Sequence, residues 1–160
     1  MERGNVKISS HRFYNNYKGH DVKDLEMMRN YFLEKNGKQK FIYLAGDSSL
    51  DNKYWIKQNI EYAVNGYDDI LEPPKSICDI CYHMNNQTNE YVTINCAVEE
   101  STLAERKYGR LLSQDNFIKE NIRENDVLIV SVGGNDIALK PSLSTIWNLL
   151  LLMKLQLNIQ

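Results

Sequence analysis

Three short, mostly apolar runs divide the chain and predict the strands of a sheet. They cover residues 41–45, 91–97 and 127–132. Each run is short for a helix and is followed by glycine or polar residues, as is typical where a strand ends at the edge of a sheet. The third run is almost entirely Val, Ile and Leu, so we expect that strand to be covered on both faces.

Apolar residues at helical spacing predict helices between these strands. The first helix begins near Asp21 and ends at Asn36-Gly37, a pair that tolerates the left-handed conformation found at helix ends. A second helix starts near Leu50, with Asp51 in its first turn, and ends at Asn65-Gly66. Further helices are expected over residues 101–112, 117–122 and 142–157.

Strands that alternate with helices predict βαβ units, so we expect an α/β fold with a mostly parallel sheet. Residues 1–37 are expected to form an N-terminal arm and a helix, and residues 38–160 the main domain. Residues 67–90 contain two prolines and a polar run, which predict a surface loop with one short strand or helix near residues 77–82.

The composition narrows the classes of function. The 160 residues carry a formal net charge of −2, without the basic excess that nucleic-acid binding requires, so we expect no nucleic-acid partner. The most apolar stretch, residues 146–153, is too short to span a membrane. Three cysteines, an odd number, and the lack of an apolar leader after Met1 indicate a reduced, cytoplasmic setting.

Polar side chains follow the first and third runs, where catalytic groups are often found. Gly46-Asp47-Ser48 comes directly after the first run, and Gly133-x-Asn135-Asp136 follows the third. A serine on a tight strand-to-helix turn exposes its hydroxyl, and backbone N–H groups there can face a developing negative charge. Ser48 is therefore the candidate nucleophile, and we expect Asp47 and Asp136 to hold their own turns through hydrogen bonds to backbone. Taken alone, the first motif is also typical of a plain turn with a capping serine.

These strand-end motifs, taken in order, resemble the SGNH hydrolases, also called GDSL-type esterases and lipases. The resemblance covers residues 38–140 and implies a three-layer α/β/α, flavodoxin-like fold. It also implies that Ser48 attacks an ester carbonyl while its own N–H, the Asn135 amide and a backbone N–H of the second block bind the oxyanion. The second block usually carries a glycine, and Ala97 stands in its place. Gly46 and Gly133 support the two turns, and we expect no metal or cofactor.

The chain departs from this family at the residues that activate the serine. In the family an Asp-x-x-His block near the C-terminus supplies the acid and the base, but no histidine follows His83 in this sequence. We therefore expect the domain to lack its last strands and to be a weak hydrolase by itself. His11, His20 and His83 are the other candidate bases, although each is more typical of a surface or packing histidine.

Cys78-x-x-Cys81, followed by His83, suggests a metal or redox site. A zinc site needs four ligands, and no second pair at finger-like spacing exists in the chain. Two loop cysteines are the simpler interpretation.

Three function classes stay open. The first is a serine hydrolase that acts on acyl or acetyl esters of small molecules, glycans or lipids. The second is a pseudoenzyme binding domain that keeps the oxyanion pocket and lacks the acid and base. The third is an interaction module that self-associates through the C-terminal helix, which is apolar over most of its circumference.

Overall fold

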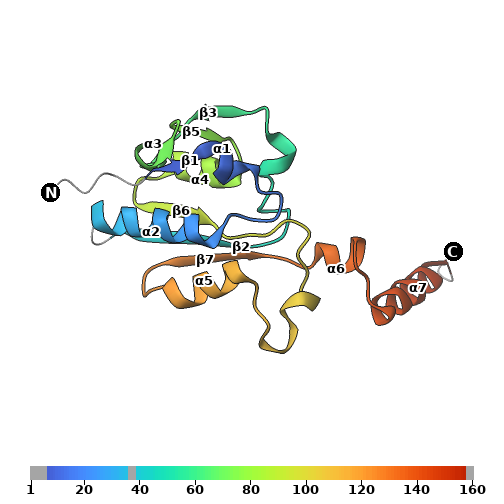
Figure 1. Cartoon of the computed structure of the whole chain (residues 1–160). Coiled ribbons are helices and arrows are strands. Elements are labelled where there is room, and N and C mark those ends of the chain that lie inside the picture. The colour runs from blue at the N-terminus through green and yellow to red at the C-terminus, as the bar shows by residue number, and fades with distance from the viewer. Residues whose placement is uncertain (1–6, 36–38, 158–160) are drawn as a thin grey trace.

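The computed structural model describes residues 7–35 and 39–157. Its centre is a three-stranded parallel sheet formed by β2 (Lys40–Gly46), β6 (Tyr91–Asn95) and β7 (Val127–Ser131). β2 lies in the middle, with β6 on one side and β7 on the other (Figure 1). The first of these strands in chain order is therefore the central one, and the second and third lie on opposite sides of it. The predicted α/β class and the parallel pairing are confirmed.

Two helices pack against one face of this sheet. α2 (Val22–Lys35) and α5 (Ser113–Asn121) contact each other, and α5 contacts β2. The Tyr43 ring of β2 is fully buried, and the Arg29 side chain of α2 donates hydrogen bonds to the Tyr43 hydroxyl and to the Asn121 carbonyl, each at 3.1 Å. The predicted first helix is confirmed, and its expected stop at Asn36-Gly37 lies outside the described residues.

The remaining short elements gather on the β6 side of the molecule, whereas α5 lies on the β7 side (Figure 1). β1 pairs in parallel with β4, and β3 pairs with β5 in an antiparallel two-stranded sheet. α1 contacts β5, and α4 contacts β6. Their bounds are β1 (Ile8–Ser9), α1 (Ser10–Asn15), β3 (Ile60–Tyr62), α3 (Tyr67–Ile70), β4 (Leu71–Glu72), β5 (Lys75–Ile77) and α4 (Ile80–Gln87).

The N-terminal arm and first helix share one core with the sheet. Phe13 of α1 and Leu25, Met28 and Phe32 of α2 belong to the same buried cluster as Phe41 of β2. Burying apolar side chains from both segments in one cluster couples the stability of the arm to that of the sheet.

The helix predicted from Leu50 to Asn65-Gly66 is wrong. The structure has a short 3₁₀ helix, η1 (Lys53–Ile56), followed by strand β3. Asp51 and Lys53 turn inward and are almost completely buried, and Ile60 of β3 pairs with Ile77 of β5. Apolar residues spaced four apart fit a strand as well as a helix, so tertiary pairing decided the outcome here.

The helix predicted over residues 101–112 is also wrong. A 3₁₀ helix, η2 (Ala104–Gly109), takes its place and is interrupted at Lys107 and Tyr108. Tyr108 and Gly109 both have positive φ, a conformation that ends a right-handed helix. The surface loop expected over residues 67–90 is wrong, because this range holds α3, β4, β5 and α4 and buries Tyr67, Ile70 and Cys81. The short element expected near residues 77–82 is present as the end of β5 and the start of α4.

The C-terminal part of the described chain leaves the body of the molecule. α6 (Gly134–Ala138) follows β7, and α7 (Leu143–Leu157) confirms the predicted final helix. Figure 1 shows α7 projecting away from the sheet. β7 is an edge strand with Leu128 and Val130 exposed, so the expectation that it is covered on both faces is wrong for the described residues. No helix in the described part of the chain is long and apolar enough to cross a membrane.

Candidate active site at the carboxyl ends of the parallel strands

The Gly46-Asp47-Ser48 turn is fitted tightly against the end of β7. Gly46 pairs with Ser131, and the Asp47 N–H donates to the Ser131 carbonyl at 3.1 Å. A Cβ at position 46 would lie 1.9 Å from the Ser131 carbonyl oxygen, well inside any allowed contact. Only glycine fits at this position, because the two backbones touch there.

Asp47 holds its turn as predicted. Its Oδ1 accepts the Ser49 N–H at 3.0 Å, and its carbonyl accepts the N–H groups of Leu50 at 3.0 Å and Asp51 at 2.9 Å. Ser48 is partly exposed on this turn, and its hydroxyl has no hydrogen-bond partner among the described residues. The Ser49 hydroxyl, by contrast, bonds the Ser131 hydroxyl at 2.7 Å. The turn therefore leaves the Ser48 oxygen as the hydroxyl that is open to a ligand.

Hydrogen bonds tie the loops after the three parallel strands into one cluster. The Ser101 hydroxyl, after β6, donates to the Gly46 carbonyl at 2.9 Å, at the end of β2. The Asn135 side chain, after β7, donates to the Ser101 carbonyl at 3.0 Å. Asn135 is buried at 8% exposure, and its amide keeps a second N–H hydrogen beyond the one that Ser101 accepts. The motifs on β2 and β7 are thus connected through Ser101.

The Ala97 N–H, in the loop after β6, is not placed to bind the oxyanion as expected. The Ala97 N–H donates to the Asn95 side chain at 3.0 Å, and Ala97 is fully buried. This N–H is therefore already bonded and is not open to an oxyanion in this structure. Glu100, three residues later, has φ +60°, a conformation that favours glycine, and its N–H has no partner among the described residues. Residue type alone could not indicate Glu100, because glutamate rarely adopts this conformation.

The loop after β7 shows why Gly133 and Asp136 occur there. Gly133 has φ +116° at the start of α6, which a side chain would strain. Asp136 was expected to hold its own loop, and this is wrong in one respect. Its carboxylate accepts the N–H groups of Leu103 at 2.7 Å and Ala104 at 2.9 Å, so it holds the loop after β6. Asp136 thus fixes one loop of the cluster to another.

A buried ion pair lies behind the Ser48 turn. Lys53 and Asp51 have exposed fractions of 0% and 1%, and the Lys53 ammonium contacts Asp51 Oδ1. Asp51 Oδ2 accepts the Gly19 N–H at 2.8 Å and the Glu99 N–H at 2.9 Å. Asp51 therefore joins the N-terminal arm, the Ser48 turn and the loop after β6, a role that its predicted place in a helix could not indicate.

The carboxyl groups of Asp79 and Glu99 are also buried and interact electrostatically with this ion pair. Burial raises the pKa of Asp79 to about 7, although its Oδ1 accepts the Tyr82 N–H at 2.8 Å. Burial likewise raises the pKa of Glu99. Asp79 Oδ2 and Glu99 Oε2 have no hydrogen-bond partner among the described residues. Both groups interact electrostatically with Lys53 and Asp51.

None of the three histidines is hydrogen bonded to Ser48 in the structure. His20 is buried, its ring stacks on Phe13 with centroids 3.8 Å apart, and burial lowers its pKa well below the ordinary value. Its Nδ1 lies 2.8 Å from the Phe13 carbonyl, so His20 is a packing residue, as predicted. His83 is exposed on α4, and His11 is exposed on α1.

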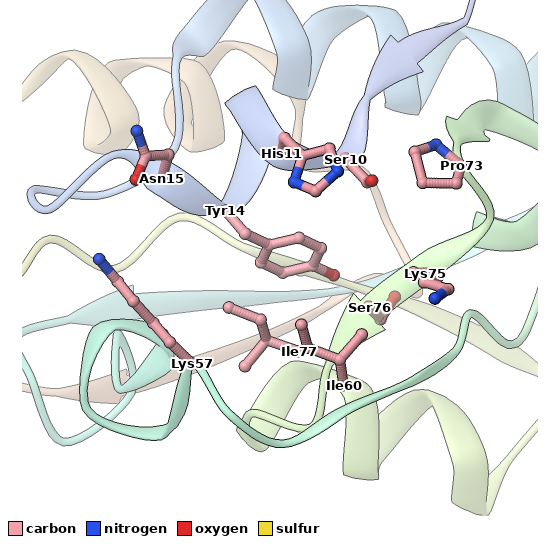
Figure 2. Close-up of a pocket in the computed structure, with 10 residues that line it drawn as sticks. All are labelled: Ser10, His11, Tyr14, Asn15, Lys57, Ile60, Pro73, Lys75, Ser76 and Ile77. Carbon is pink, nitrogen blue, oxygen red and sulfur yellow. The ribbon is translucent and has the colours of Figure 1, made fainter.

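His11 and Tyr14 of α1 line a cavity of about 180 Å³ together with Lys75 and Ser76 of β5. Figure 2 shows these side chains. The Tyr14 hydroxyl points toward Ser76 across the middle of this cavity. Ser48 does not line it. A second cavity, of about 310 Å³, lies between β7 and α5 and reaches Gly46.

The two cysteines of the Cys78-x-x-Cys81 motif do not form a reactive pair in the structure. Cys81 is buried, its Sγ donates to the Thr93 carbonyl at 3.3 Å, and burial raises its pKa strongly, which disfavours the thiolate. Cys78 is partly exposed, and burial raises its pKa as well. In the part of the chain that the structure describes, no group of three His, Cys, Asp or Glu side chains is placed to hold a metal ion.

Comparison with protein families, with curated proteins and with solved structures finds no match to this chain. The motifs and the geometry at the strand ends are therefore the features of this chain that indicate a function.

Proposed function

We propose that the chain is a serine hydrolase domain of the SGNH type, in which Ser48 attacks an ester carbonyl. The observation that carries the proposal is the hydrogen-bonded path from Gly46 through Ser101 to Asn135. It connects the loops after all three parallel strands around the turn that presents Ser48. Ligands of open parallel sheets bind at this edge.

The strand order supports the same proposal. Taking β2, β6 and β7 as the first, second and third strands, the order in space is second, first, third. This is the beginning of the flavodoxin-like order, in which helices cover both faces of the sheet. The complete three-layer α/β/α architecture is part of this proposal.

The oxyanion of the proposed reaction would be held by three donors. These are the N–H of Ser48, the second hydrogen of the Asn135 amide and the N–H of Glu100. We assign the donor of the second loop to Glu100 because the Ala97 N–H is bonded to Asn95. Each donor of an oxyanion hole is typically worth about 2.7–4 kcal/mol of transition-state stabilisation.

The same geometry leaves the serine without an activating base. A serine hydroxyl is a weak nucleophile until a base accepts its proton, and no histidine bonds Ser48 in the described residues. The proposed activity of this chain is therefore a slow reaction with acyl or acetyl esters of small molecules, glycans or lipids. The pseudoenzyme binding domain is the second candidate, and this missing contact is the observation that favours it.

Labelling with a fluorophosphonate probe separates the two candidates. We expect slow labelling of Ser48, accelerated by added imidazole, which can act as a base from solution. Ser48→Ala should abolish labelling, whereas the matched control Ser49→Ala should retain it. Labelling that persists in Ser48→Ala would place the nucleophile elsewhere. If no serine is labelled at any imidazole concentration, the binding-domain alternative replaces the hydrolase.

A further inference from the structure

Two apolar surfaces lack a partner among the residues that the structure describes. One is the cavity between β7 and α5, lined by apolar side chains that include Ile118, Ile122, Leu128 and Val130. We call it the β7–α5 groove. The other is α7, whose only charged residue is Lys154. Val130 is 60% exposed in the groove and Leu150 is 53% exposed at the middle of α7.

The handedness of the fold indicates what belongs in the β7–α5 groove. Connections between parallel strands are right-handed in nearly all proteins. The step from β6 to β7 carries α5, and a further step outward from β7 runs in the same direction, so its helix lies on the same face as α5. The long helix that follows β7, after the short helix α6, is α7. The groove is therefore the position that the fold offers to α7.

The linker shows why α7 of the same chain does not occupy this groove. The N–H groups of Leu139 and Lys140 both donate to the Asn135 carbonyl, at 3.0 and 2.9 Å, and Lys140 pairs with Glu105 at 2.8 Å. Ser142 already caps α7, because its carbonyl accepts the Ile146 N–H at 2.9 Å. Only Pro141 lies between these two anchored ends, and its φ is fixed by its ring. This short linker directs α7 away from the body, as Figure 1 shows.

We propose that two copies of this chain exchange their C-terminal helices, each α7 lying in the β7–α5 groove of the other copy. Exchange of an identical element places it at the site it would fill in a closed monomer, and a short hinge favours this outcome. The charges fit the exchange. Arg106 and Asp115 at the groove are paired with each other at 2.8 Å, so an apolar helix leaves neither of them without a partner. Lys119, the third charged residue of the lining, is exposed to solvent.

The contact formed by the exchange is reciprocal. A 15-residue helix is about 22 Å long, and the exchange makes the contact twice, with two such helices in two grooves. The reciprocal contact has two-fold symmetry, so it closes at the dimer and does not propagate into fibres.

The mass of the 160-residue chain in solution, measured by sedimentation over a range of concentrations, tests the exchange. We expect a dimer that Val130→Lys and Leu150→Glu each convert to a monomer. Mixing equal amounts of these two variants should restore a dimer. The unaltered α7 of Val130→Lys can lie in the unaltered groove of Leu150→Glu, and in the other contact the new glutamate meets the new lysine. Asn148→Glu, on the same helix, is the control if far-UV circular dichroism shows that all variants fold. A wild-type chain that stays monomeric would overturn the proposal, as would a dimer that Val130→Lys leaves intact, since α7 would then pair with α7.

A second experiment distinguishes exchange from closure within one chain. In a Cys78→Ser background, which removes the partly exposed native thiol, Leu128→Cys combined with Leu150→Cys should give a disulfide-linked dimer on oxidation, visible without reductant and absent from either single variant. Inserting a flexible Gly-Ser segment after Pro141 should convert the dimer into a monomer, because α7 then reaches the groove of its own chain. An internally linked monomer without the insertion would contradict the exchange.

Discussion

The buried carboxylate of Asp51 accepts a hydrogen bond from the backbone N–H of Glu99, 48 residues further along the chain, at 2.9 Å. The same oxygen accepts the N–H of Gly19, and the other oxygen contacts Lys53. A single side chain thus fixes the loop that follows β6 relative to the turn that presents Ser48.

Replacing Asp51 should therefore destabilise the whole domain. Asp51→Asn leaves the buried Lys53 ammonium without a counter-charge, which typically costs about 3–5 kcal/mol. Urea unfolding followed by tryptophan fluorescence measures this loss, with the exposed Glu26→Gln as the control. Adding Lys53→Met to Asp51→Asn should recover part of the stability, because it removes the uncompensated charge. A single variant as stable as the wild type would show that the pair does not hold this region together.

Gly46→Ala should destabilise the junction of β2 and β7. The new methyl group would meet the Ser131 carbonyl at 1.9 Å, so the strands must separate. Overpacking of this kind typically costs about 1–3 kcal/mol, and Ser48 labelling should fall with it. Gly134→Ala is the matched control, since a Cβ there meets nothing within 4 Å. Equal unfolding midpoints for the two variants would refute the close approach of the strands.

The stability of the domain should depend on pH through Asp79. Burial raises the pKa of this carboxyl from its ordinary value of 3.8 to about 7, so between these values the folded chain holds a proton that the unfolded chain has lost. The contribution of Asp79 to stability is therefore full below about pH 4 and is lost as the pH rises to about 7. Asp79→Asn keeps an oxygen for the Tyr82 N–H and cannot ionise.

The measurement is the difference in unfolding free energy between the wild type and Asp79→Asn at several pH values. We expect the unfolding free energy of Asp79→Asn to rise relative to that of the wild type between pH 4 and pH 7, by on the order of a few kcal/mol. Glu34→Gln, which changes an exposed carboxyl, should show no such trend. Parallel curves for the wild type and Asp79→Asn would rule out this titration.

Asn135→Ala should slow the proposed reaction at Ser48. Loss of one oxyanion donor typically lowers the rate by about 10²–10³-fold. The readout is the rate of fluorophosphonate labelling in imidazole, with the exposed Asn116→Ala as the control. Because Asn135 also bonds the Ser101 carbonyl, thermal unfolding of the same variant must confirm that it is folded. Unchanged labelling by folded Asn135→Ala would remove this residue from the site.

Much of this architecture could be predicted from residue patterns. Buried runs such as Phe41 to Ala45 have few alternatives to a central strand, and glycine at positions 46 and 133 signals close approach or positive φ. The two misplaced helices show that residue spacing alone does not distinguish a helix from other local structures. Ile60 has helical spacing from Ile56, yet it pairs with Ile77, and that pairing depends on a partner distant in sequence. Glu100 was missed for a related reason, since its left-handed conformation contradicts its residue type.

The two edges of the central sheet are chemically different. At the outer edge of β6, the Asn85 side chain accepts the Thr93 N–H at 2.9 Å and donates to the Thr93 carbonyl at 3.0 Å, and Asn65 donates to the Tyr91 carbonyl at 2.8 Å. Side-chain amides there take the place of a neighbouring strand and block β-augmentation. β7 has no such cover in the described residues. The sheet can therefore grow in one direction only, and any extended segment that joins it must pair with β7.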